Sequence, residues 1–478
     1  MKPMNDSQHG NDAETARGAG VSPARLAGIL PASGEAGLTS SSDQPHGAHN
    51  AGETPASQGF ASYRLRDHRS AWLTILAGGF NAFFGSLSFG SSVLVLYFMK
   101  LELPLDKIGR LLSFFPFAGV VAVVLAPLTA RFGFKRTFCL FYGIRKFVLL
   151  STLATPAVME RFGVDVGVAY VTAVILLFAL CRAIAETGYY PWSLGFVPGE
   201  VRGRYSAANN FVYSVVGLGA MVLASLSLQR SSGIGTFHWF IGGGAAVGFV
   251  GVVLHVFVPG GGPVRRTVRV GLYVRKMLAA FGHREFRRFL LSVGLLALSA
   301  GPMSFLPAYL KGGPFGLLDE HIVLVSMAGL VGNMAGSVVW GRVADRVGGR
   351  RTQILGLLMG CVFPMLWLVL PGGSLCLVAA LVLALSGSVV GVGTAVGSSK
   401  HLFGQLVPPR RRAEFSAAWY ASVGLCGGAG PLIAGHLLVA LQGNPLTIGP
   451  AVVSPFVLLF LATTVLQLAA AGVLAGRK

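Results

Sequence analysis

The stretch ARFGFKRT, from Ala130 to Thr137, returns later in the chain as DRVGGRRT, from Asp345 to Thr352, a shift of 215 positions (130 to 345). A second stretch, VPGEVRGRYSAA at 197–208, returns as VPPRRRAEFSAA at 407–418, a shift of 210 positions (197 to 407). Each stretch is a short basic connection between two long apolar segments. Two separate matches at nearly equal shifts predict that the chain consists of two related halves.

The apolar segments around these connections are long enough to cross a lipid bilayer. Of the 478 residues, 53% are hydrophobic and 12% are charged, whereas about 25% of the residues in soluble domains are charged. A membrane-spanning helix needs roughly 20 mostly apolar residues, and a helix satisfies its own backbone hydrogen bonds. The sequence therefore predicts an all-α membrane protein with twelve transmembrane helices in two six-helix bundles, near 72–98, 109–130, 137–158, 167–192, 206–228, 237–258, 289–310, 321–341, 353–371, 374–400, 414–440 and 449–475.

This count divides the chain into four parts. Residues 1–68 are rich in small and polar residues and lack the basic start and apolar core of a secretory signal. We expect them to form a disordered cytoplasmic tail, because they have too little apolar surface to bury. Residues 69–258 and 289–478 are the predicted six-helix bundles, and the basic residues 259–288 are the predicted cytoplasmic linker.

The formal net charge of +20 would suggest nucleic acid as a partner of a soluble protein, but the distribution of the charges favours a membrane. With the N-terminus placed in the cytoplasm, the inner connections hold 25 of the 38 Lys and Arg residues, and the outer connections hold 6. Cytoplasmic loops collect basic residues. We therefore expect a multi-pass protein of the cell inner membrane with both termini in the cytoplasm, the lipid bilayer as its surroundings and no nucleic-acid partner.

The segment GRVADRVGGRR, from Gly341 to Arg351, resembles the loop signature that the major facilitator superfamily carries between the second and third helices of each half. The first-half copy has Ala130 where an acid is expected. The resemblance covers roughly residues 70–476 and implies a secondary transporter of two rocking bundles, with the substrate site between them near the midplane. The positions that match the signature are Gly341, Asp345, Arg346, Gly348, Arg350 and Arg351.

The loop signature has a physical interpretation as a gate. A carboxylate at Asp345 can pair with neighbouring basic groups and with the N-terminus of another helix. Such pairs would hold the cytoplasmic side closed in one state of a transporter. The alternative is a solvated loop charge, which contributes little.

Among the acidic residues, Glu186 is the one that lies well inside an apolar span. An ionisable residue within the membrane is a functional hypothesis by default. Arg182 lies four residues earlier, so the two side chains share one helix face. Burial favours the protonated carboxyl and a nearby guanidinium favours the carboxylate. A rearrangement that makes or breaks the pair would therefore bind or release a proton, whereas a static pair would merely neutralise itself.

Other polar residues inside the spans are candidates for contact with a solute. Arg145 and Lys146 lie midway along the third span and would favour an anionic solute, unless they snorkel or pair between helices. Lys400 ends the tenth span, which lines the central site in the resembled fold, although an interfacial lysine would also fit there. In that fold the fourth helix often carries an arginine followed by glycines, and Glu186 replaces one of those glycines. Weaker candidates are Asn81 and Tyr189.

Together these features predict a transporter, and an enzyme is not expected. The five cysteines and the scattered histidines show no metal or haem spacing, and no phosphate-binding loop signature occurs. We therefore expect no metal, no cofactor and no use of ATP. The prediction is a monomeric, proton-coupled symporter of a small polar or anionic molecule. The alternatives are lipid or drug efflux and a membrane sensor that does not transport.

Overall fold

The computed structural model describes most of the chain from Arg69 to Gly476. The predicted tail, residues 1–68, lies outside this part. Three basic residues of the predicted linker, Arg265, Arg266 and Arg269, lie outside it as well. The described residues are 69–90, 92–197, 202–263, 270–312, 315–407, 411–443, 447–448, 451–452 and 454–476.

Among the described residues, twelve helical segments are long and apolar enough to cross a membrane, which confirms the predicted count. The first six are built from α1 (Arg69–Ser88), α2 (Ser92–Lys100), α3 (Leu105–Phe132), α4 (Phe134–Leu150), a 3-10 turn (Ser151–Ala154), α5 (Thr155–Phe162), α6 (Val164–Phe196), α7 (Arg202–Arg230) and α8 (Ile234–Val256). The second six are built from α10 (Arg284–Met303), α11 (Leu306–Lys311), α12 (Asp319–Val347), α13 (Gly349–Gly360), α14 (Phe363–Leu368), α15 (Leu375–His401), a π-helical turn (Leu402–Leu406), α16 (Arg412–Gly443) and α17 (Pro455–Ala475).

The structure differs from the sequence prediction at the twelfth span and in the linker. The twelfth span begins at Pro455 rather than at residue 449, because β1 (Thr447–Ile448) and β2 (Ala451–Val452) form a short antiparallel hairpin before it. Proline suits the first turn of a helix, where its missing N–H has no partner to lose. The linker contains a further helix, α9 (Val270–Ala280), which buries Met277 against α16 and α3.

The two halves repeat each other in the positions of their breaks. The first span is divided between α1 and α2, and the seventh is divided between α10 and α11. Helix α10 has the bounds of α1 shifted by 215 residues at both ends (69 to 284 and 88 to 303). The two loop glycines, Gly133 and Gly348, have φ angles of +99° and +85°, which glycine adopts without steric cost. The duplication seen in the sequence is therefore also present in the backbone.

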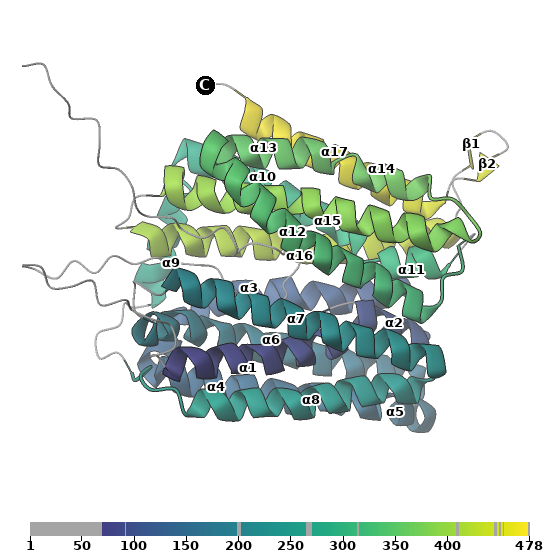
Figure 1. Cartoon of the computed structure of the whole chain (residues 1–478), viewed down its shortest axis with the longest axis horizontal. Coiled ribbons are helices and arrows are strands. Elements are labelled where there is room, and N and C mark those ends of the chain that lie inside the picture. Colours follow the sequence, from purple (N-terminus) through teal and green to yellow (C-terminus); the bar gives the residue numbers. More distant parts are fainter. Residues whose placement is uncertain are drawn as a thin grey trace, which may run out of the picture.

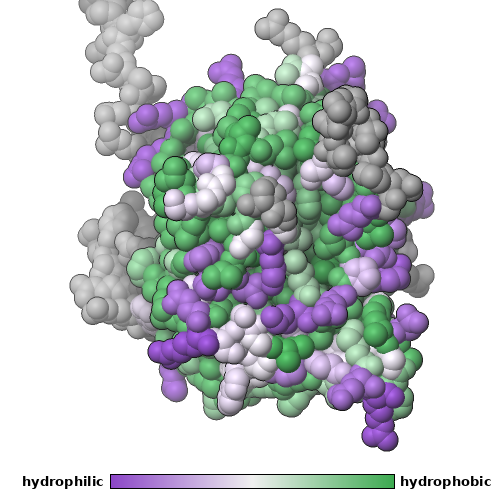
Figure 2. Space-filling view, turned by 90° about the vertical axis from the view of Figure 1, so that its right-hand side faces the viewer, coloured by the Kyte–Doolittle hydropathy of each residue, from purple (hydrophilic) through white to green (hydrophobic). Residues whose placement is uncertain are grey.

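Figure 1 shows α1–α8 on one side of the molecule and α10–α17 on the other, with the long helices running roughly along the horizontal. We call the end that holds α9 the basic end, and the end that holds β1 and β2 the hairpin end. They lie at the left and right of Figure 1. Figure 2 looks onto the hairpin end and shows hydrophilic residues spread among apolar ones.

The halves are joined most closely at the hairpin end. One buried apolar cluster there contains residues of both halves, among them Phe98 of α2, Leu310 of α11 and Ile322 of α12. Ser326 of α12 donates a 2.9 Å hydrogen bond to the hydroxyl of Ser92 on α2. Toward the basic end, the apolar clusters of the described residues belong mainly to one half each. The two halves are therefore packed together at the hairpin end.

Candidate functional site

Four ionisable side chains lie together inside the N-terminal half. Arg145 and Lys146 lie in α4, and both are fully buried. Arg182 and Glu186 lie one turn apart on α6; Arg182 is buried, while 26% of the Glu186 side chain is exposed. Helices α4 and α6 pack closely on each other, which brings the two pairs together. We call these four residues the charged group.

Arg182 and Glu186 form the pair that their spacing indicates. Arg182 Nε donates a 2.9 Å hydrogen bond to Glu186 Oε1. The guanidinium of Arg182 also lies over the rings of Phe89 and Phe115, with 5.7 and 6.0 Å to the ring centroids. Glu186 is thus the most accessible member of the charged group, and it is held by a buried cation.

Arg145 has one hydrogen-bond partner among the described residues. Its Nη2 donates to Asn81 Oδ1 on α1 at 2.7 Å. Its Nε and Nη1 are buried and find no partner in the part of the chain that the structure describes. The guanidinium lies instead over Tyr142, Phe84 and Phe89, at 3.9, 5.7 and 5.8 Å. A desolvated cation over an aromatic ring gains about 2 kcal/mol, so these rings offset part of the lost hydration.

Lys146 is enclosed in a similar way. Its Nζ donates a 3.3 Å hydrogen bond to the backbone oxygen of Tyr142, and it lies 3.9 Å from the ring of Tyr142 and 4.7 Å from that of Phe84. Gly248 of α8 leaves the space for the lysine stem, because a Cβ there would lie 2.6 Å from Lys146 Cε. Neither Arg145 nor Lys146 snorkels to the bilayer surface.

The charged group therefore carries more positive than negative charge. Arg145, Lys146 and Arg182 are three basic side chains, and Glu186 is the one carboxylate that pairs with any of them in the described structure. The ring of Phe89 lies against the guanidinium groups of both Arg145 and Arg182. A buried ion without a counter-charge costs several kcal/mol. An anionic ligand bound beside these side chains would supply the missing counter-charge and so lower this cost.

An aromatic group lies on the basic-end side of the charged group. His255 of α8 contacts the rings of Phe138, Tyr142, Tyr189 and Trp192 at centroid distances of 4.8 to 6.1 Å. Its Nδ1 lies 2.7 Å from the backbone oxygen of Gly251. The sequence did not indicate this cluster, because its members come from three helices. Tyr189, a weak candidate from the sequence, belongs to it, and its hydroxyl lies 3.0 Å from that of Tyr205 on α7.

The C-terminal half has no counterpart of the charged group. The positions that match Arg145 and Lys146 at a shift of 215 are Gly360 and Cys361, and Val392 matches Arg182 at a shift of 210. Lys400 lies elsewhere, near the basic end, where its Nζ is 2.6 Å from Asp345 Oδ1. The structure thus brings together two candidate residues that the sequence alone does not connect.

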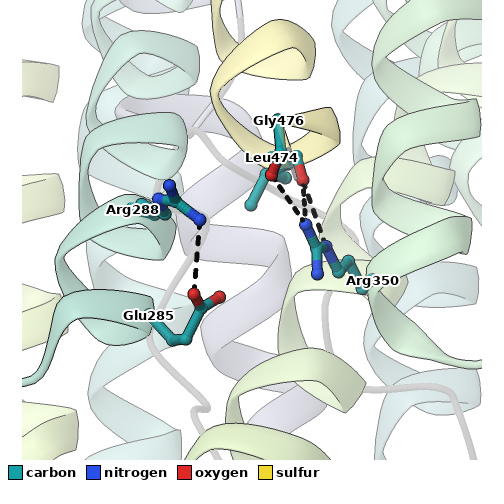
Figure 3. Close-up of polar contacts among 5 residues, drawn as sticks. All are labelled: Glu285, Arg288, Arg350, Leu474 and Gly476. Carbon is teal, nitrogen blue, oxygen red and sulfur yellow. Dashed lines mark hydrogen bonds and ion pairs between the residues drawn. The ribbon is translucent and has the colours of Figure 1, made fainter. Parts of the chain in front are cut away.

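Arg350 of the loop signature has a different partner. It donates to the backbone oxygens of Leu474 and Gly476 at the end of α17 (Figure 3). The last carbonyls of a helix have no partner within the helix, so the guanidinium caps α17. In the same view Glu285 and Arg288 of α10 form an ion pair at 3.3 Å. Arg346 and Arg351 are exposed, and Gly341 is buried in α12.

The pair of Asp345 and Lys400 is expected to contribute little to stability. Both side chains are partly in water, with exposed fractions of 65% and 38%, and exposed ion pairs contribute about 0.2 to 1 kcal/mol. A double-mutant cycle with Asp345→Asn and Lys400→Met, measured by unfolding in mixed micelles, should give a coupling energy within that range. A coupling above about 2 kcal/mol would identify a structural rather than a gating contact.

Comparison with known proteins adds independent findings. The family model described as Major Facilitator Superfamily matches residues 76–431. The nucleoside transporter NupG is similar in structure, with a TM-score of 0.65 and 14% identity over 85% of this chain and 98% of that chain. No curated protein sequence matches the chain.

A bacterial homologue of the iron transporter ferroportin is similar in two states. Its inward-facing structure gives a TM-score of 0.62 at 17% identity, and its outward-facing structure gives 0.56 at 16% identity. Each comparison covers 85% of this chain and 98% of the other chain.

Proposed function

The chain belongs to the major facilitator superfamily, and from this premise we propose that it is a secondary active transporter that moves a small polar or anionic solute across the inner membrane by proton-coupled alternating access. The observation that carries the proposal is the charged group. Three buried basic side chains lie beside one partly exposed carboxylate, inside a chain of twelve candidate spans. Intramembrane charges are costly and mark solute or proton pathways.

In this proposal Glu186 binds and releases the proton. Its side chain is the accessible member of the charged group, and its partner Arg182 lies on the same helix. Movement of the two halves relative to each other would change the exposure of both residues together. A protonated Glu186 would free Arg182 for the solute, so uptake of proton and solute would be linked, as in a symporter.

We further propose that the basic end faces the cytoplasm and that the described structure is open toward it. The positive-inside bias supports this orientation. The apolar cluster shared by both halves at the hairpin end supports an inward-facing state. The higher TM-score of the inward-facing ferroportin homologue supports it as well. Because one chain supplies both halves, a monomer suffices.

Proteoliposome uptake tests the proposal. Purified protein would be reconstituted and offered labelled succinate, inorganic phosphate or butyrate with an inwardly directed proton gradient. We expect at least one of these anions to accumulate above the level of protein-free vesicles, and a protonophore to abolish the accumulation. Uptake that needs no pH gradient would contradict the coupling, and absence of uptake of all three anions would contradict an anionic solute.

A further inference from the structure

We propose that the solute carries two negative charges, that Arg145, Lys146 and Arg182 bind it within the N-terminal half, and that the ring of Phe89 gives way to it. This inference rests on the proposed function and deepens it by naming the charge of the solute and the side chain that it displaces. It concerns a small dianion, whether its charges come from two carboxylates or from one phosphate group.

The number of charges follows from the charged group. Counted at their formal charges, three basic side chains and one carboxylate leave two positive charges without a counter-charge in the described structure. Arg145 and Lys146 are fully buried, so bulk water does not screen them. A dianion would neutralise the group as it is paired in the described structure, whereas a monoanion would leave one positive charge. With Glu186 protonated, a dianion would leave one positive charge, a monoanion two and a neutral solute all three.

The open hydrogen-bonding positions point to oxygen atoms of the ligand. Nε and Nη1 of Arg145 are buried without partners in the described structure, while Nη2 is held by Asn81. Nearly all buried hydrogen-bond donors in protein structures have an acceptor. A guanidinium presents its donors in a planar fork that matches the oxygens of a carboxylate or phosphate. Lys146 would add a point charge beside the fork.

Phe89 holds the place of the ligand in the described state. Its ring lies 5.8 Å from the guanidinium carbon of Arg145 and 5.7 Å from that of Arg182, so it contacts both arginines at once. A ring face is a weaker partner for a cation than an anion is. Phe89 also lies in the break between α1 and α2. Its ring packs against Phe84, Phe115 and Phe178 at centroid distances of 5.4, 6.3 and 5.0 Å, and the solute would displace it from these rings.

The second half provides a natural comparison. Phe305 occupies the matching break between α10 and α11, and it is fully buried. Among the described residues no cation lies over its ring, because the charged group has no counterpart in that half. Phe305 therefore shares with Phe89 the break and a buried ring but not the charged neighbours, and it lies one position further along, since Ser304 is the residue that matches Phe89 at a shift of 215.

Equilibrium binding to the purified full-length protein in detergent tests the charge of the solute. Succinate and butyrate have the same number of carbon atoms and differ by one carboxylate, and inorganic phosphate is the second dianion. We expect succinate, phosphate or both to bind about tenfold or more tightly than butyrate. Tight binding of succinate alone would identify the solute as a dicarboxylate, and tight binding of phosphate alone would identify it as a molecule with a phosphate group. Butyrate binding as tightly as both dianions, or no binding of any of the three, would overturn the inference.

Variants test the assignment to these residues. Arg145→Gln and Lys146→Met each remove one cation and should reduce the preference for the dianion over butyrate to near one, with unchanged elution in gel filtration. Phe89→Leu keeps an apolar side chain but removes the ring, so it should tighten dianion binding several-fold. Phe305→Leu should leave the affinity unchanged. Equal effects of the two Phe→Leu changes, or none from Phe89→Leu, would overturn the role of Phe89.

The binding and transport measurements can contradict this inference and the proposed function independently of each other. Dianion binding without transport would contradict the transporter and leave the binding site standing. Transport of butyrate as efficient as that of the dianions would contradict the dianion and leave the transporter standing.

Discussion

Glu186→Gln is expected to abolish accumulation driven by a pH gradient and to leave exchange of internal for external solute intact. Glutamine keeps the size of the side chain and an oxygen for Arg182, but it cannot bind or release a proton. Exchange requires solute binding and movement of the two halves, and neither needs a change of protonation. Proteoliposomes loaded with the transported anion would measure both modes in one preparation, with net uptake falling to the level of protein-free vesicles.

The matched control is Glu285→Gln on α10. Glu285 is also paired with an arginine on its own helix, Arg288, but 46% of its side chain is exposed at the basic end. The same chemical change there should leave both net uptake and exchange unaffected. If Glu186→Gln retained full pH-driven accumulation, the proton would have to be carried by another group.

Gly109→Val is expected to prevent the hairpin end from closing and so to abolish transport. Gly109 of α3 faces Gly435 of α16 across the two halves, and a Cβ at Gly109 would lie 2.4 Å from the backbone oxygen of Pro431. Backbone atoms cannot move aside within a packed helix pair. Two helices can approach as closely as α3 and α16 do only where small residues lie at the contact. The clash lies between the halves rather than inside one of them, so each half can still fold.

The control for this change is Gly119→Val on the same helix, because a Cβ at Gly119 meets nothing within 4 Å. Flux would be measured together with labelling of a cysteine introduced at Ser92, in a background that lacks the native cysteines. Ser92 is buried at the junction of the halves. We expect a membrane-impermeant maleimide to label it in the Gly109→Val protein but not in the Gly119→Val protein. Normal flux with no labelling would mean that the α3–α16 contact tolerates the side chain.

Prediction from the sequence succeeded where the determining forces are local. The twelve spans follow from runs of apolar residues, since each helix satisfies its own backbone in the membrane. The breaks after Ser88 and Met303 escaped prediction, because each lies inside a segment that is long and apolar enough for one continuous span. Helix α9 escaped it because it is short and lies in the stretch interpreted as a basic linker, and the β1–β2 hairpin because residues 451–452 were included in the twelfth span.

The same distinction applies to the candidate site. The sequence by itself determined the pair of Arg182 and Glu186, since a spacing of four residues places two side chains on one face of any helix. Only the tertiary structure decided that Asn81 holds Arg145, that Lys400 pairs with Asp345 and that Phe89 lies against two arginines. These contacts join different helices. Helical periodicity sets which residues share a face, but the rotation and approach of packed helices set which faces meet.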